Sequence, residues 1–187
     1  ILLTKTRVEN FREREGRVFT SGRKPRRSEW VGIKMHVRKL PLFGDLELHL
    51  GRSNYVGLCG VEEDAVNVCG LFHRTQAAGG GGPELLIRAL RSGGLPALAD
   101  RIRAAEPEGA SLVTVAGLSF DHDDPDDDRL RLGDALRAIP PFTGHGMTLA
   151  FQAAAAAVEP LHAWAAGRAE WSETVSVVKH RIRTRAG

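Results

Sequence analysis

The sequence lacks several features that define whole classes of protein. None of its 187 residues belongs to an apolar run long enough to span a bilayer, and no signal peptide is visible. It also contains no Gly-x-Gly-x-x-Gly turn, because the glycine run at 79–82 has the wrong spacing and precedes Pro83. We therefore expect a soluble cytoplasmic protein with no transmembrane segment and no dinucleotide-binding glycine turn in these residues.

Cysteine is scarce, and no metal site is predicted. Cys59 and Cys69 lie in separate apolar, strand-like segments without neighbouring histidines, so we expect buried, reduced thiols and no zinc centre. The acidic run at 121–128 could begin a calcium-binding loop at Asp121. Such a loop would need Gly at its sixth position and Glu at its twelfth. The sequence has Asp126 and Leu132 there, so we predict a solvent-exposed loop.

Charge is unevenly distributed along the chain. Residues 1–39 carry a balance of +8, which leaves −5 on the remaining 148 residues, given the net charge of +3. The densest basic cluster, at 23–27, lacks interleaved aromatic residues and a recognition-helix pattern, so no nucleic-acid binding is predicted. Two readings stay open for this cluster: a solvated face, or a loop near a phosphate-rich cofactor.

The segment at 133–154 is the most informative part of the chain. Asp134 follows an apolar and basic stretch and is expected at the carboxyl end of a strand, where open sheets bind ligands. Two prolines at 140–141 stiffen the following turn, and Gly144 and Gly146 carry no Cβ that would keep a flat ligand away. An alanine-rich helix then points unpaired N–H groups and its positive dipole end at the same place. This order predicts a cofactor site at a helix N-terminus.

This order resembles the second flavin-binding motif of the FAD-dependent oxidoreductases built like p-hydroxybenzoate hydroxylase, and within them the geranylgeranyl-reductase-like branch. The family pattern is Gly-Asp-Ala, a short spacer, Pro-x-x-Gly-x-Gly and a helix of small and apolar residues. The resemblance implies that Asp134 contacts the ribityl or diphosphate part of FAD and that the amides of Met147 and Thr148 face the pyrimidine edge of the flavin. The cofactor-binding residues it implies are Gly133, Asp134, Pro141, Gly144, Gly146, Met147 and Thr148.

The sequence departs from the family pattern at three places. Many relatives carry a His and an Asn where this chain has Arg137 and Thr148, which puts a side-chain contact to flavin in question. The glycine turn that opens the family's flavin domain is missing, so we expect the carboxyl-terminal portion of a larger flavoprotein, with that turn upstream of Ile1. A buried alanine-rich helix after a proline loop, with no ligand, remains the plainer alternative.

Hydrophobic periodicity predicts a mixture of strands and helices. The resemblance implies that they form an α+β fold, an α/β flavin-domain remnant plus an antiparallel substrate domain, as part of an FAD/NAD(P)-binding fold. Residues 30–72 are expected to form an antiparallel meander, because the turns are short. The resemblance implies three segments: a piece of the flavin-binding domain at 1–28, the substrate domain at 29–120 and the returning flavin segment with helices at 121–187. Strands are predicted at 1–8, 17–20, 30–38, 46–50, 55–58, 65–72 and 111–118, and helices at 84–91, 95–105, from 146 past 157, and 170–185.

We expect an FAD-dependent oxidoreductase, a reductase or a monooxygenase, that acts on an apolar or aromatic small molecule. NAD(P)H stays open as the electron donor, and an electron-transfer flavoprotein or a non-catalytic binding module stays open as the function. No residue is identified as the catalytic acid or base. The histidines His36, His49 and His145 and the single Tyr55 are weak candidates, and the oligomeric state is not predicted.

Overall fold

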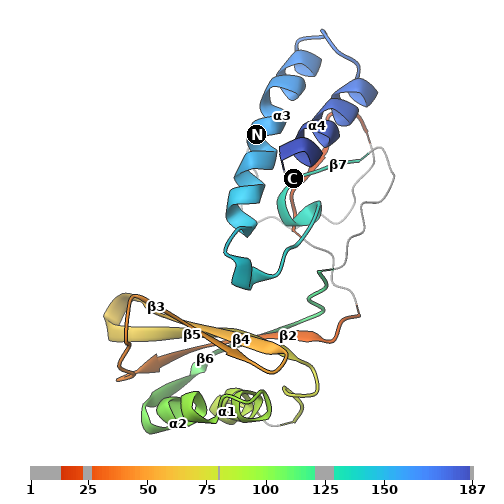
Figure 1. The fold of residues 1–187 in the computed structure, drawn as a ribbon. Helices are drawn as coiled ribbons and strands as arrows, with labels where there is room; N and C mark the ends of the chain where they lie inside the picture. Colours follow the sequence, from red (N-terminus) through yellow and green to blue (C-terminus); the bar gives the residue numbers. More distant parts are fainter. Residues whose placement is uncertain (1–13, 23–26, 80, 121–128, 186–187) are drawn as a thin grey trace. The chain divides into compact units, whose positions relative to one another are not determined.

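The computed structural model describes residues 14–22, 27–79, 81–120 and 129–185 (Figure 1). The chain divides into two compact units, Ile1–Lys24 with Phe120–Gly187 and Pro25–Ser119. We call them the two-strand unit and the five-strand unit. The predicted strand at 1–8, the acidic run at 121–128 and most of the basic cluster at 23–27 lie outside the described residues. The assignment of the two units to flavin and substrate binding stays a prediction.

The two-strand unit joins a short parallel sheet to two helices. Strand β1 (Val18–Phe19) pairs in parallel with β7 (Leu130–Arg131), and the helices are α3 (Gly146–Ala165) and α4 (Trp171–Arg185). Two short 3-10 turns, η2 (Gly133–Ala135) and η3 (Pro141–Thr143), connect β7 to α3. The buried side chains between sheet and helices are Leu130, Leu132, Ala153, Ala157, Val175 and Val178.

Alanine lets helix α3 pack closely and also favours the helix itself. The sequence predicts a kink or restart at Pro160, but α3 continues as one helix through this residue, which is buried. The helix ends as predicted at Gly167, whose φ of +68° suits glycine. The amides of Gly167 and Arg168 donate to the carbonyls of Trp164 and Ala163, at 2.9 Å each. The sequence therefore signals this helix end correctly.

The five-strand unit is an antiparallel sheet with two helices on one face (Figure 1). Strand β2 (Trp30–Arg38) lies between β5 (Ala65–His73) and β6 (Glu106–Ala116), while β3 (Leu46–Gly51) and β4 (Asn54–Gly60) complete the other edge. The predicted meander is therefore correct for β3, β4 and β5 and wrong for β2. Alternation fixes which side chains share a face, but not which strand becomes the neighbour.

The core of this unit lies between the sheet and helices α1 (Pro83–Ser92) and α2 (Pro96–Ala104). From β2, Ile33, Met35 and Val37 contribute fully buried side chains to it. Each helix begins with a proline, whose missing N–H would have no intrahelical partner at that position. The helices are thus those predicted, with each boundary one residue away from its predicted position.

The two cysteines differ from expectation in burial. Both thiols are free, as predicted, but Cys59 is only half-buried and Cys69 is exposed. They lie on the sheet face opposite the helices, since their ladder partners Asn67 and Lys34 do not belong to the core. An apolar sequence context does not reveal which face of a sheet is covered.

Strand β3 buries its polar side and exposes its leucines. Leu46, Leu48 and Leu50 are 61%, 57% and 74% exposed, whereas Glu47 is only 9% exposed. Alternation predicts the strand correctly, but the covered side is the reverse of what hydrophobicity indicates. The reason lies in the partners of Glu47 on the helix side of the sheet.

The Glu47 carboxylate links the edge strand to helix α2. Arg101 donates from Nη1 to Oε2 at 2.9 Å and from Nη2 to Oε1 at 3.2 Å. The amide of Phe43 and the ring of His49 add contacts of 2.8 Å each, and the Arg101 guanidinium lies 4.5 Å from the Phe43 ring centre. The Arg101 bonds, with those of Phe43 and His49, outweigh burial and lower the pKa of Glu47 to about 2.

Replacing Glu47 by Gln should lower the free energy of unfolding by about 2 kcal/mol, because hydrogen bonds to a charged, buried group are lost. The folded-state pKa of Glu47, about 2, lies below its ordinary value of 4.5. The wild-type advantage is therefore complete above about pH 4.5 and disappears as the pH falls toward 2. Urea unfolding at several pH values measures both effects.

Glu84→Gln is the matched control, since Glu84 pairs with Arg103 at the surface with 61% and 49% of the side chains exposed. It should change stability by less than about 0.5 kcal/mol. An equal loss in both variants, or a Glu47→Gln effect independent of pH, would contradict the role assigned to Glu47.

Candidate cofactor-binding site

The parallel pair β1 and β7 places two loops at one sheet edge. Val18 is paired with Leu130 and Phe19 with Arg131, and the amide of Leu132 donates to the carbonyl of Phe19 at 3.0 Å. Because the strands run the same way, the residues that follow them leave at the same edge. The small residues after β1 therefore lie beside the Gly-Asp pair after β7.

The turn after β7 depends on Gly133. Its φ is +59°, in the left-handed region that favours glycine, and its carbonyl accepts from the amides of Leu136 and Arg137 at 2.9 and 3.1 Å. This compact turn directs Asp134 outward. The Asp134 side chain is exposed, and the described residues supply no hydrogen bond to its carboxylate.

A second compact turn brings the chain to helix α3. The amide of Thr143 donates to the carbonyl of Pro140 at 3.2 Å, and the amide of Gly144 donates to that of Pro141 at 3.0 Å. Gly144 then takes a φ of +68°. A Cβ built on Gly144 would meet no atom within 4 Å, so the backbone here borders open space.

Helix α3 begins with free amide groups. It starts at Gly146, no side chain caps it, and the first helical hydrogen bond runs from Leu149 N to His145 O at 2.9 Å. The amides of Gly146, Met147 and Thr148 precede that bond and have no partner within the helix. They give this end of the helix a partial positive charge.

These turns and the helix end surround one open cavity of about 720 Å³, within the range of small-molecule sites. Six of the seven residues predicted from the motif line it: Gly133, Asp134, Pro141, Gly144, Gly146 and Met147. Thr148 does not line it. The structure thus brings the predicted residues together, while their contact with FAD stays a prediction.

Other lining residues were not predicted. Thr20 and Gly22 reach the cavity from the end of β1, and Phe151 reaches it from the second turn of α3. The small-residue turn at 20–22 was the available signal, because such a turn after a strand resembles the one after β7. No sequence signal marks Phe151, since a single aromatic residue on an alanine-rich helix does not belong to any motif that predicts a binding site.

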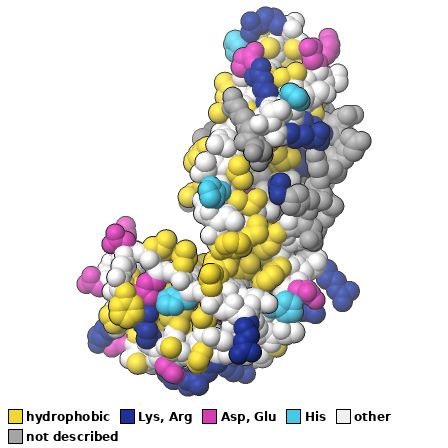
Figure 2. Space-filling model, viewed as in Figure 1, with side chains coloured by type: hydrophobic (Ala, Val, Ile, Leu, Met, Phe, Trp, Pro, Cys, Tyr) yellow, Lys and Arg dark blue, Asp and Glu magenta, His cyan; other side chains and the backbone are white. Residues whose placement is uncertain are grey.

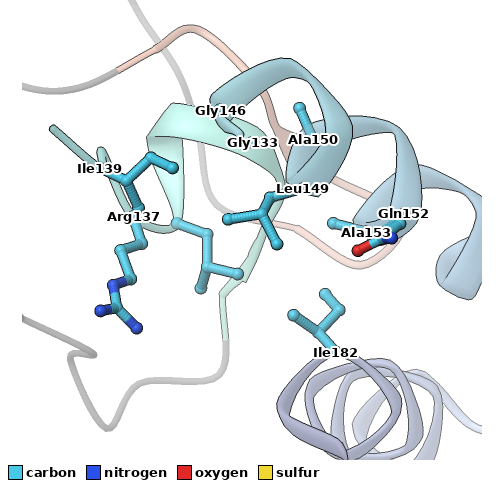
Figure 3. A pocket seen from close by; sticks show the side chains of 10 residues that line it. Gly133, Arg137, Ile139, Gly146, Leu149, Ala150, Gln152, Ala153 and Ile182 are labelled. Atoms are coloured by element: carbon cyan, nitrogen blue, oxygen red, sulfur yellow. The ribbon is translucent and has the colours of Figure 1, made fainter. Parts of the chain in front are cut away.

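A second, smaller cavity lies on the other side of the first turns of α3 (Figure 3). Its volume is about 200 Å³, and Leu149 and Ile182 point toward one another across it. Arg137, at the position where many relatives have His, belongs to this second cavity. Four residues line both cavities and form the wall between them: Gly133, Ile139, Gly146 and Ala150.

The weaker catalytic candidates are dispersed. His49 lies on the helix side of its sheet and contacts Glu47, away from the large cavity. His36 and Tyr55 lie on the opposite, uncovered side, where partial burial raises the pKa of Tyr55 to about 12. His145 is exposed at the start of α3 and does not line the large cavity.

Two features are absent from the described part of the chain. No helix among them is both long and apolar enough to cross a membrane. No group of three or more His, Cys, Asp or Glu side chains in the described part of the chain is placed to hold a metal ion.

The α+β fold, with one unit an antiparallel sheet with helices and the other a parallel strand pair that leads into a long helix, is that of FAD-dependent monooxygenases and halogenases. The predicted fold class is therefore confirmed. It rests on similarity to solved structures, because no family model and no curated protein matches the sequence.

Three solved structures illustrate the likeness. PqsL, a probable FAD-dependent monooxygenase from Pseudomonas aeruginosa, matches 89% of this chain and 51% of its own, with a TM-score of 0.57 and 16% identity. The myxobacterial chondrochloren halogenase CndH matches 91% of this chain and 44% of its own, with a TM-score of 0.63 and 16% identity. A variant of HpxO from Klebsiella pneumoniae, solved with FAD, matches 90% of this chain and 47% of its own, with a TM-score of 0.55 and 16% identity. The chain thus spans about half the length of these proteins.

Gly133→Ala should lower the free energy of unfolding by about 1 kcal/mol. A methyl group fits the space, since a Cβ would lie 3.5 Å from that of Ala150, but an L-residue is strained at a φ of +59°. Gly60→Ala is the control, because a Cβ there meets no atom within 4 Å and the backbone is not left-handed. Equal stabilities of the two variants in urea would rule out strain at Gly133.

Proposed function

We propose that this chain is part of an FAD-dependent oxidoreductase, a reductase or a monooxygenase, and that the large cavity binds the flavin end of FAD. One observation carries the proposal: six residues of the flavin-binding motif line a single cavity at the N-terminus of α3. The fold is that of FAD-dependent enzymes, and one of the similar structures contains FAD. When bound, FAD supplies hydride and electron transfer.

The backbone beside the cavity suits a flat ring system. Gly144 borders open space, where any larger residue would project a side chain. Apolar contact for a ring is available from Pro141, Met147 and Phe151, which line the cavity. Met147 and Phe151 are 77% and 73% exposed without a ligand, so a bound ring would bury apolar surface.

The Asp134 carboxylate suits the ribityl chain rather than the diphosphate. A carboxylate only accepts hydrogen bonds, as a diphosphate does, whereas ribityl hydroxyls donate them. The described residues leave the Asp134 oxygens without a donor, so a ligand hydroxyl would not displace an existing bond. This assigns Asp134 the orientation of the sugar-like part of the cofactor.

The free amides of α3 suit the edge of the flavin that becomes negative on reduction. Gly146, Met147 and Thr148 offer N–H groups, and the helix dipole adds positive potential. Groups aimed at developing charge stabilise the reduced state more than the oxidised one. The chain itself therefore raises the tendency of the bound cofactor to accept electrons.

The substrate proposed is an apolar or aromatic small molecule. The resemblance to the geranylgeranyl-reductase-like branch favours reduction of a carbon–carbon double bond, while PqsL and CndH are named as a probable monooxygenase and a halogenase. An electron-transfer flavoprotein that uses the same cradle is the second candidate. It is favoured by the lining of the cavity in the described residues, where Asp134 is the one ionisable side chain and is assigned to the ribityl chain rather than to a substrate.

Asp134→Ala in the full-length protein should weaken FAD binding by roughly 1–3 kcal/mol, about 5- to 150-fold, because ribityl hydroxyls lose an acceptor. Flavin fluorescence quenching during titration with FAD measures the affinity. Asp45→Ala is the control, since Asp45 is exposed and lies in the other unit. Unchanged affinity in Asp134→Ala would remove this residue from the site.

Turnover experiments separate the reaction classes. Rapid oxidation of NADPH or NADH upon addition of substrate is expected for a monooxygenase. A reductase or an electron carrier should instead be reduced slowly and require another donor. A full-length protein that purifies without yellow colour and binds no FAD at micromolar concentration would exclude every flavin-dependent reading.

A further inference from the structure

The smaller cavity of the two-strand unit differs in chemistry from the large one. Its volume is about 200 Å³, and its lining comes from η2 and the loop after it, from α3 and from α4. The large apolar side chains in this lining are all aliphatic: Leu136, Ile139, Leu149 and Ile182. No described residue that lines it is aromatic or acidic. Such walls offer dispersion contacts to an alkyl chain and no ring face on which an aromatic ligand could stack.

Arg137 is the charged residue among the described residues that line this cavity. Its side chain extends from one side of the cavity in Figure 3 and is exposed, so the charge lies where the cavity meets the solvent. Within the described residues its guanidinium has no hydrogen bond or ion pair, unlike that of Arg168, which contacts Nδ1 of His162 at 3.0 Å. Its N–H groups are therefore available to a ligand carboxylate, which a guanidinium binds through two parallel hydrogen bonds.

The helix on the far side of the cavity is basic as well. Helix α4, which contributes Ile182, has four basic side chains and one acidic side chain in its sequence, a balance of +3. The acidic one, Glu173, lies in the first turn, away from Ile182. Figure 2 shows Lys and Arg side chains, in dark blue, at the surface of this unit. Positive potential of this kind raises the local concentration of anions.

We propose that the smaller cavity is a binding site for a linear aliphatic carboxylate, with the alkyl chain inside and the carboxylate paired with Arg137. A dry apolar cavity of about 150 Å³ accepts a ligand of about six carbon atoms, and the volume here is slightly larger. This cavity is a different space from the one assigned to FAD, since the two are separated by a wall of four residues. The inference therefore goes beyond the proposed function and does not rest on it.

The test titrates hexanoate, butanoate and hexanamide into the full-length protein at constant ionic strength and follows them by ligand-observed NMR. Hexanoate should bind about tenfold tighter than butanoate, because two further methylene groups leave water. It should also bind about tenfold tighter than hexanamide, which cannot form the charge-assisted pair. Saturating FAD should leave the hexanoate affinity unchanged, because the cofactor would occupy the other cavity.

Variants of two lining residues separate the charge from the cavity. Arg137→Gln should reduce the hexanoate affinity to that of hexanamide without changing the latter, whereas Arg137→Lys should keep the preference, since the positive charge remains. Leu149→Trp should abolish binding of both probes, because Leu149 lines only the smaller of the two cavities and the larger ring would fill it. Arg168→Gln is the matched control, an exposed arginine of the same unit that lines neither cavity, and should behave like wild type.

Five outcomes would overturn the proposal: equal affinity for hexanoate and hexanamide, unchanged hexanoate binding in Arg137→Gln, unchanged binding in folded Leu149→Trp, displacement of hexanoate by FAD, or no hexanoate binding at millimolar concentration. Circular dichroism verifies that each variant is folded. Arg137 is exposed, so its variants decide the question even if Leu149→Trp does not fold. A protein that binds no FAD but retains the preference for hexanoate would refute only the flavin assignment.

Discussion

The candidate site depends on the parallel pairing of two very short strands. Val18–Phe19 and Leu130–Arg131 are far apart in sequence, yet their pairing brings the ends of both strands to one edge. Thr20 and Gly22 thereby reach the same cavity as Gly133 and Asp134. Without this register the Gly-Asp turn would border only its own helix, and the cavity would lose one of its walls.

The five-strand unit shows how buried charge can reverse the polarity of an edge strand. Glu47 is accommodated on the helix side because Arg101, Phe43 and His49 satisfy its oxygens. Once Glu47 faces the helix, the period of two residues directs Leu46, Leu48 and Leu50 outward. The same ion pair that links β3 to α2 therefore leaves these three leucines exposed on the sheet face opposite the helices.

Local signals in the sequence predicted most elements and six of the residues that line the large cavity. Glycine and proline at 133–146 encode turns through short-range geometry, so their consequences are visible without a structure. The position of β2, the exposure of Cys69 and the contribution of Phe151 were not predictable in this way. Each depends on which distant segment covers a given face, and periodicity carries no information about that.

By itself, the sequence determined the order of the elements, the tight turns η2 and η3 and a helix with unpaired N-terminal amides. These follow from the backbone limits of glycine and proline and from the high helix propensity of alanine. Only the tertiary structure decided that β1 pairs with β7 next to this segment and that β3 turns its leucines to the surface. Those outcomes arise from contacts between residues far apart in the chain, which no local preference specifies.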